Sequence, residues 1–251
     1  MLRAFADGHF FGELFGDGPP QVIWLHGWGR SGADFRKSGE QLAARGIASL
    51  ALDLPGFGAS PAPQSVMGAR GYAEVVARVI DEATSGQPYV LVGHSFGGRI
   101  AAVLASRHDT NLRGVIFAGA PLVARTVKKK RRPSVRYRAL RAAARWRLVS
   151  TDRLEAAKRH YGSTDYRNAT GIMRDVLVAT VNETYEKELT SIAKPCVFIW
   201  GANDGDVPFE IAERAAALVH GKSTLREFPN RGHLVPIDNP DALVAAVVEL
   251  M

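Results

Sequence analysis

Short apolar runs recur along the chain, and longer stretches with a helical spacing of apolar residues separate them. Most of the runs are apolar at consecutive positions, as expected of parallel strands that helices cover on both faces. Strands are therefore predicted over residues 21–25, 47–52, 89–92, 114–118 and 196–200, and a last strand over residues 224–228. Helices are predicted over residues 32–45, 69–84, 96–108, 209–219 and 240–250, and an antiparallel hairpin over residues 2–15, turning near Asp7 and Gly8. This alternation predicts an α/β fold built on a mostly parallel sheet.

The alternation stops between residues 121 and 192, where no convincing strand pattern occurs. Helical spacing is present over residues 134–149 and 172–189, and Ala139, Ala142 and Ala143 favour a helix in the first of these stretches. The sequence therefore predicts an all-helical insertion in an α/β core. The expected division is a first core segment at residues 1–120, the helical insertion at 121–192 and a second core segment at 193–251.

Positive charge is concentrated in this insertion. The chain has a net charge of +7, but residues 121–159 contain 14 Lys or Arg against Asp152 and Glu155, which gives that segment +12 and leaves the remainder at −5. Such a block can be a solvated helix face, or it can bind an anionic partner such as an acidic carrier protein, a phosphate-bearing thioester or an acidic lipid surface. No set of base-stacking aromatic residues accompanies the run from Lys128 to Arg132, so nucleic-acid binding is not expected.

The composition is close to the average for soluble globular proteins. No segment approaches the ~18 consecutive apolar residues that a membrane span needs. Asp7 and Glu13 interrupt the apolar N-terminal stretch, so a signal peptide is not expected. The single cysteine, Cys196, cannot form an internal disulfide and is expected to be a buried apolar side chain. A cytoplasmic location is the resulting expectation.

A serine stands at the centre of the segment Gly93-His94-Ser95-Phe96-Gly97, between a predicted strand and a predicted helix. A serine on such a tight turn is exposed above the sheet, and small residues two positions away on each side relieve the crowded backbone. The alternative is a helix-capping serine in a Gly-rich turn. The strand–turn–helix context favours a nucleophilic Ser95, with the N–H of Phe96 directed at an oxyanion.

A second Gly-rich turn, His26-Gly27-Trp28-Gly29, follows the strand predicted at residues 21–25. In a hydrolase of this architecture such a turn supplies the second N–H of the oxyanion hole, which we assign to Trp28. His26 is expected to hold the loop in place rather than to act as a base. The side chain of Trp28 is expected to form part of the pocket wall.

An acid and a base complete the candidate site. Asp204 and Asp206 both follow the strand predicted at residues 196–200, and Asp204 is preferred because it lies three residues after Gly201 and four before Pro208. Turn formation and helix capping are the alternative roles for these aspartates. Of the seven histidines, His233 alone lies in a loop after the last predicted strand, so it is the candidate base.

Five segments resemble, in order, those of the α/β-hydrolase superfamily: HGWG at residues 26–29, DLPGFGAS at 53–60, GHSFGG at 93–98, GANDGDVP at 201–208 and GHLVPIDNP at 232–240. The chain order Ser95, Asp204, His233 is also the order that this fold uses. The resemblance implies an eight-stranded, mostly parallel sheet with a helical cap at residues 121–192. Ser95 speaks against the haloalkane dehalogenase and epoxide hydrolase branches, which use aspartate at that position.

The resemblance implies a serine hydrolase that cleaves a carboxylic ester or related acyl bond through an acyl-enzyme, with no cofactor and no metal ion. The expected substrate is a small-molecule or acyl-chain ester, bound by Trp28, Phe57, Trp146 and Leu234. The HGWG and DLPGFG segments are similar to those of the pimeloyl-carrier methyl esterases, a family in which a basic cap meets an acidic acyl carrier protein. Two alternatives remain: hydrolysis of a C–C bond or a lactone, and ligand binding without turnover.

Overall fold

The computed structural model describes residues 1–125 and 164–251, and within them it contains one sheet of eight strands. The strands are β1 (Leu2–Phe5), β2 (Phe10–Phe15), β3 (Val22–Leu25), β4 (Ser49–Asp53), β5 (Tyr89–His94), β6 (Leu112–Ala118), β7 (Cys196–Gly201) and β8 (Ser223–Phe228). Each strand predicted from an apolar run is present. The predicted hairpin forms β1 and β2, which a turn at Ala6–Gly8 connects.

The strands lie in the order β1-β2-β4-β3-β5-β6-β7-β8. β2 pairs antiparallel with both β1 and β4, whereas the other five pairings are parallel. The predicted α/β fold with a mostly parallel sheet is therefore confirmed. Cys196 lies buried in β7, as predicted, and burial raises the pKa of its thiol to about 12. In the described part of the chain, no helix has both the length and the apolar character that crossing a membrane requires.

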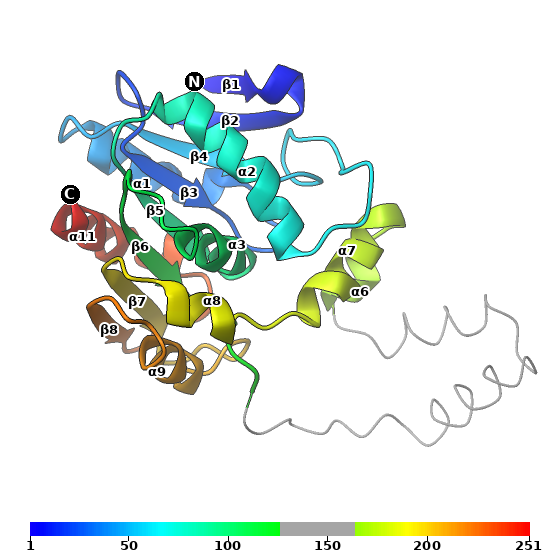
Figure 1. Cartoon of the computed structure of the whole chain (residues 1–251), viewed down its shortest axis with the longest axis vertical. Coiled ribbons are helices and arrows are strands. Elements are labelled where there is room, and N and C mark those ends of the chain that lie inside the picture. Colours follow the sequence, from blue (N-terminus) through cyan, green and yellow to red (C-terminus); the bar gives the residue numbers. More distant parts are fainter. Residues whose placement is uncertain (126–163) are drawn as a thin grey trace, which may run out of the picture.

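Helices cover both faces of the sheet (Figure 1). One face carries α2 (Ala69–Thr84), α3 (Phe96–Ala105), α8 (Glu186–Ser191) and α9 (Glu210–Ala216). The other face carries α1 (Arg36–Ala43), α10 (Val235–Asp238) and α11 (Pro240–Leu250). The helices predicted at residues 69–84 and 240–250 have the predicted bounds. The one predicted at residues 32–45 begins instead as a 3₁₀ turn at Gly32–Phe35 and becomes α-helical at Arg36.

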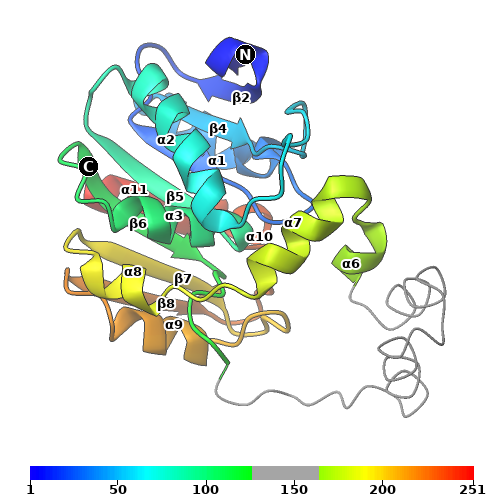
Figure 2. The same cartoon turned by 45° about the vertical axis from the view of Figure 1, so that its right-hand side comes forward.

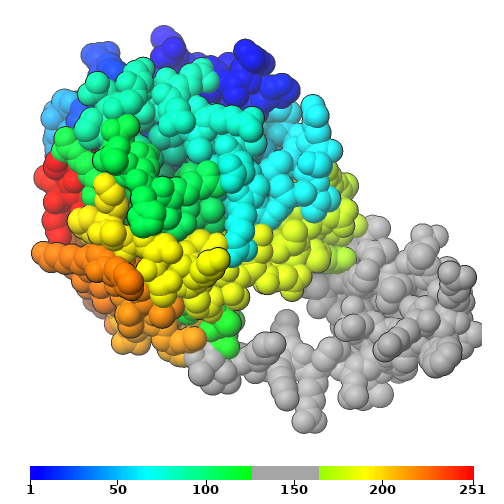
Figure 3. All heavy atoms as spheres, viewed as in Figure 1, coloured from blue at the N-terminus to red at the C-terminus, as the bar shows by residue number. Residues whose placement is uncertain are grey.

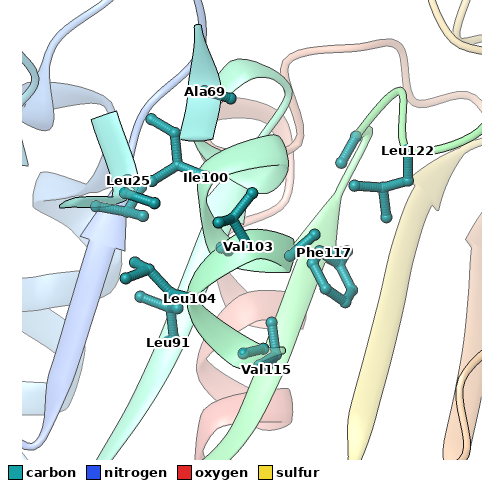
Figure 4. Close-up of a cluster of buried hydrophobic side chains, with 14 of the residues drawn as sticks. Leu25, Ala69, Leu91, Ile100, Val103, Leu104, Val115, Phe117 and Leu122 are labelled. Atoms are coloured by element: carbon teal, nitrogen blue, oxygen red, sulfur yellow. The ribbon is translucent and has the colours of Figure 1, made fainter. Parts of the chain in front are cut away.

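Alternate residues of the central strands divide between two hydrophobic cores. In β3, Ile23 and Leu25 contribute to the core beneath α2 and α3, whereas Val22 and Trp24 contribute to the core beneath α1 and α11. Figure 4 shows the first of these cores, in which side chains of α3 pack over the sheet: Ile100, Val103 and Leu104 against Leu25, Leu91, Val115 and Phe117. Burial on both faces explains why these strands are apolar at consecutive positions.

Within the predicted insertion, residues 121–125 are not helical, and the described part from residue 164 onwards contains α6 (Thr164–Asn168), α7 (Gly171–Val181) and α8. The prediction of one helical stretch over residues 172–189 is wrong, because residues 182–185 separate α7 from α8. Figure 2 places α6 and α7 at one end of the sheet, and Figure 3 shows their yellow-green atoms against the cyan atoms of the loop that precedes α2. A Cβ atom on Gly56 in that loop would lie 2.3 Å from Met173 Sδ of α7, so glycine permits the close approach. Trp146 and the helix predicted at residues 134–149 lie outside the described residues.

Glu183 fastens the link between α7 and α8 to the core. Its Oε2 atom accepts hydrogen bonds from the N–H of Ala69 and from the hydroxyl of Tyr185, both at 2.8 Å. Ala69 is the first residue of α2, so the carboxylate caps the positive end of that helix. Arg70 lies 3.7 Å from Glu183 Oε1. The break in the predicted helix is what allows Glu183 to reach this position.

Replacing Glu183 with Ala is expected to lower the free energy of unfolding by about 1–2 kcal/mol, because a helix cap and a partly buried hydrogen bond are lost together. Glu74→Ala is the matched control. Glu74 pairs with Arg107 but is 65% exposed, so its removal is expected to cost less than about 0.5 kcal/mol. Urea denaturation of both variants measures the difference. Equal losses would contradict the capping role of Glu183.

Candidate active site

Three side chains that are far apart in the sequence meet at the carboxyl edge of the sheet. Ser95 directly follows β5, Asp204 lies in the loop after β7, and His233 lies in the loop after β8. His233 Nε2 is 3.0 Å from Ser95 Oγ, and His233 Nδ1 is 2.7 Å from Asp204 Oδ2. When Nδ1–H donates to the carboxylate, Nε2 is left to accept the serine proton. The structure thus brings together the three residues that the sequence predicts as nucleophile, acid and base.

The backbone at Ser95 has an unusual conformation, with φ 49° and ψ −107°. Such a positive φ is uncommon for a residue with a side chain and persists only where the surroundings hold it. The N–H of Ser95 donates to Ala118 O of the neighbouring strand at 2.9 Å, and the N–H of Gly97 donates to His26 O at 3.0 Å. These two hydrogen bonds fix the turn between β5 and α3 on both sides.

The two glycines that flank Ser95 are required by close backbone contacts. A Cβ atom on Gly97 would lie 2.1 Å from Leu25 O, and one on Gly93 would lie 2.5 Å from Gly97 O. Neither space can hold a methyl group, since the opposing atoms belong to the backbone. The spacing of glycines around Ser95 therefore follows from how tightly α3 approaches β3 and β5.

The carboxylate of Asp204 is fixed by the backbone of its own loop. Its side chain is only 1% exposed, and Oδ1 accepts the N–H groups of Asp206 at 2.9 Å and Val207 at 2.7 Å. Oδ2 is thereby left for His233. Asp206 is exposed and supplies a backbone donor, so the geometry favours the sequence-based choice of Asp204 over Asp206.

The two residues predicted to form the oxyanion hole lie beside Ser95. Phe96 is the first residue of α3, and the N–H of a first helical residue has no partner within its own helix. The ring of Trp28 packs edge-on against Phe96, with centroids 5.4 Å apart, and against Phe57 at 5.0 Å. This aromatic cluster fixes the loop that carries Trp28 against the start of α3.

His26 has a structural role, as the sequence predicts. Its Nε2 accepts the N–H of Leu54 at 3.0 Å, so its Nδ1 carries the proton and donates to Gly27 O at 2.7 Å. The ring is fully buried, and burial lowers the pKa of His26 to about 4. A neutral His26 thus ties the loop after β3 to the loop after β4.

His94 connects the serine turn to the loop of His233. Its Nε2–H donates to the backbone oxygen of His233 at 2.8 Å, and the two rings lie 5.0 Å apart. Burial lowers the pKa of His94 to about 4. A Cβ atom on Gly27 would lie 2.8 Å from His94 Nδ1, which explains the glycine opposite it. His94 therefore positions His233 while remaining uncharged, although it neighbours Ser95 in sequence.

A cleft of about 790 Å³ opens over Ser95 and His233. Among the expected substrate-binding residues, Trp28 and Leu234 line it, Phe57 packs against Trp28, and Trp146 lies outside the described residues. The cleft also has charged and polar lining that the sequence analysis did not assign: Arg30, Thr164, Asp165, Arg167 and Asp206. Arg30 directly follows the HGWG segment, which is the signal that could have identified it. Thr164, Asp165 and Arg167 belong to α6, and no local sequence pattern indicates that the folded chain brings them to the cleft.

Asp204, Asp206 and His233 also offer three potential ligand atoms for a metal ion, within 4.8 Å of one another. Both carboxylate oxygens of Asp204 already accept hydrogen bonds, and His233 bridges Asp204 and Ser95. These hydrogen bonds form a proton relay, and the His233 imidazole can act as a base in it only when its Nε2 atom does not bind a metal ion.

Comparisons with known proteins agree with the fold. Residues 22–247 match the alpha/beta hydrolase family, and the chain belongs to that family. Its similarity to enzymes named as esterases supports a hydrolase that acts on ester bonds.

Three similar proteins cover nearly the whole chain. The pimeloyl-(acyl-carrier protein) methyl ester esterase of Chromobacterium violaceum is 30% identical over 96% of this chain and 97% of its own length. The 2-succinyl-6-hydroxy-2,4-cyclohexadiene-1-carboxylate synthase of an Enterobacter species is 27% identical over 93% of this chain and 92% of its own length. The solved structure of an esterase from Exiguobacterium antarcticum has a TM-score of 0.73 and 22% identity to this chain, and the match covers 99% of this chain and 97% of that one, which is a likeness of fold.

The two buried histidines are expected to make the fold sensitive to acid. Each is neutral when folded, with a pKa of about 4 against 6.5 when exposed, so the unfolded chain binds more protons between these values. Stability is then lost as the pH falls from 6.5 towards 4, by about 2 kcal/mol for each histidine at pH 4.5. Urea denaturation of wild type and His94→Gln at pH 7 and pH 4.5 measures this loss. Glutamine keeps an N–H donor but does not titrate, so the variant should lose about 2 kcal/mol less; an identical loss would refute a neutral buried His94.

Proposed function

We propose that this protein hydrolyses carboxylic esters through an acyl-enzyme, with Ser95 as nucleophile, His233 as base and Asp204 as the carboxylate that orients it. The observation that carries the proposal is the continuous hydrogen-bonded relay of 3.0 Å from Ser95 Oγ to His233 Nε2 and 2.7 Å from His233 Nδ1 to Asp204 Oδ2. A serine hydroxyl is a weak nucleophile, and an adjacent, oriented base is what activates it.

The reaction has two acyl-transfer steps. His233 takes the proton of Ser95 as Oγ attacks the ester carbonyl, and Asp204 stabilises the imidazolium that forms. The N–H groups of Trp28 and Phe96 hold the oxyanion of the tetrahedral intermediate. The intermediate collapses when His233 gives its proton to the leaving alcohol, which leaves an acyl ester on Ser95. Water then attacks this ester, with His233 again as base, and releases the carboxylic acid and the free serine.

Neutral His94 supports these steps electrostatically. Its ring lies 5.0 Å from His233, so a charge on it would oppose the imidazolium that the reaction forms. Since burial holds the pKa of His94 near 4, the ring stays uncharged at neutral pH. Hydrogen bonding to the backbone of His233 is its contribution at that pH.

The first test is hydrolysis of p-nitrophenyl esters with two to sixteen acyl carbons, by wild type and Ser95→Ala. Wild type is expected to release nitrophenol with a preferred chain length, and the substitution is expected to reduce kcat by at least about a thousandfold, because it removes the nucleophile. Undiminished activity in Ser95→Ala would overturn the assignment. If esters of no chain length react, the simple-esterase proposal fails. Hydrolysis of ring-cleavage products or lactones, and ligand binding without turnover, are then the alternatives to test.

The basic segment supports a second part of the proposal: the ester is presented by an acidic acyl carrier protein. Residues 121–159 carry a net charge of +12, and the relative from Chromobacterium violaceum is named for an ester linked to an acyl-carrier protein. Complementary charge accelerates encounter and orients an acidic partner. Of this segment, residues 126–159 lie outside the described part of the chain. A cytoplasmic location stays a prediction from the sequence.

Salt separates carrier recognition from the chemistry. Raising the ionic strength from about 0.02 M to 0.5 M is expected to raise the KM for a carrier-linked ester by about tenfold or more, because screening weakens the attraction between exposed charges. The KM for an uncharged p-nitrophenyl ester serves as the control and should change by less than about twofold. If the two substrates respond alike to salt in steady-state assays, the basic segment does not bind the carrier.

A further inference from the structure

Arg30 is a cation built into the wall of the cleft over Ser95. It lies in the loop after β3, two residues beyond Trp28, and lines the same cleft as Ser95 and His233. Its N–H donates to Gly27 O at 3.2 Å, so its backbone belongs to the turn that begins with His26. Two residues span at most about 7 Å of chain, so Arg30 lies within a short carbon chain of the proposed oxyanion hole.

Asp34 holds the Arg30 guanidinium in a fixed orientation. Arg30 Nε donates to Asp34 Oδ2 at 2.8 Å, and Arg30 Nη2 donates to Asp34 Oδ1 at 2.6 Å. The Asp34 side chain is 8% exposed, whereas that of Arg30 is 37% exposed. The hydrogen bond to Asp34 raises the pKa of Arg30, so the cation persists at any working pH. The buried carboxylate thus orients the group, and its exposed part faces a space that a ligand can enter.

One edge of the guanidinium has no partner among the described residues. An arginine side chain has five N–H donors, and the pair with Asp34 uses only the Nε–Nη2 edge. The Nη1–Nη2 edge retains three donors in the planar geometry that matches a second carboxylate. An arginine already fixed by one carboxylate loses little side-chain freedom when it binds another anion, which favours binding.

Two carboxylates and a second arginine also line the cleft. Asp165 and Arg167 come from α6 and Asp206 from the loop after β7, and burial together with the charge of Asp206 raises the pKa of Asp165. These carboxylates repel an anion on the side nearer His233, because Asp165 also interacts electrostatically with that residue. An anionic group of a substrate is therefore favoured at Arg30 over the part of the cleft beside Asp165 and Asp206.

We propose that the free edge of Arg30 binds a carboxylate on the substrate, so that among esters that are not linked to a carrier the monoesters of short dicarboxylic acids are preferred. This substrate class rests on the proposed esterase function. The ester carbonyl lies at Ser95 and the far carboxylate lies on Arg30, with the connecting methylenes along Trp28. Arg30 in this role determines specificity and takes no part in bond breaking.

The kinetic test compares monoethyl adipate with ethyl hexanoate, which share a six-carbon acyl chain and differ in the terminal carboxylate. Acid release in a pH-stat gives kcat/KM for each. Wild type is expected to have a kcat/KM at least about tenfold higher for the adipate ester than for ethyl hexanoate. Arg30→Gln is expected to reduce this ratio of kcat/KM values by about 10- to 100-fold, because the two charge-assisted hydrogen bonds from the guanidinium to the substrate carboxylate are lost. Arg36→Gln is the matched control, since Arg36 pairs with Glu13 and does not line the cleft; it should keep the wild-type ratio.

Binding without turnover separates this proposal from the esterase function. Calorimetry of adipate with Ser95→Ala is expected to give a Kd at least about tenfold lower than with the double variant Ser95→Ala, Arg30→Gln. If ester hydrolysis depends on Ser95 while neither the ratio nor the Kd depends on Arg30, the carboxylate site is overturned and the esterase stands. If no ester is cleaved but adipate binding still requires Arg30, the carboxylate site stands and the esterase fails.

Discussion

The strained backbone of Ser95 is the constraint on which the rest of the site depends. Its positive φ persists because β6 accepts its N–H, and the loop after β3 accepts the N–H of Gly97. Those partners are in place only when β3, β5 and β6 are adjacent and parallel and when α3 lies close against them. The apolar contacts of α3 with the sheet therefore hold the serine turn as well as the fold (Figure 4).

The three histidines around this turn show how burial assigns different roles to one side chain. His26 and His94 are fully buried, and burial lowers the pKa of each to about 4, so both remain neutral and act through fixed hydrogen bonds. The His233 side chain is 17% exposed and hydrogen-bonds to a carboxylate, which suits a group that must gain and lose a proton. One neutral ring thus anchors the loop of Trp28, and the other anchors the loop of His233.

The sequence was sufficient for the features that have a strong local cause. Strands buried on both faces must be largely apolar, and this pattern located β3 to β7, whereas β8 is only partly buried. The glycines around Ser95 are required because a Cβ atom at either position would lie less than 3 Å from backbone atoms, and this requirement is visible in the sequence as the glycine spacing around the serine. The break between α7 and α8 was missed because it depends on the contact of Glu183 with the start of α2. These residues are 114 positions apart in the sequence, and the spacing of apolar residues gives no information about such a distant contact. The charged lining from α6 was missed for the same reason, since only the folded chain brings it to the cleft.

The central claim is that Ser95 is an activated nucleophile, and covalent trapping tests it most directly. An aryl diethyl phosphate is incubated with wild type, Ser95→Ala and His233→Asn, and intact mass and peptide mapping follow the adduct. A single diethylphosphoryl group on Ser95 of wild type, none on Ser95→Ala and greatly slowed labelling of His233→Asn are the predicted result. An unlabelled wild-type protein, or an adduct on another residue, would contradict the account.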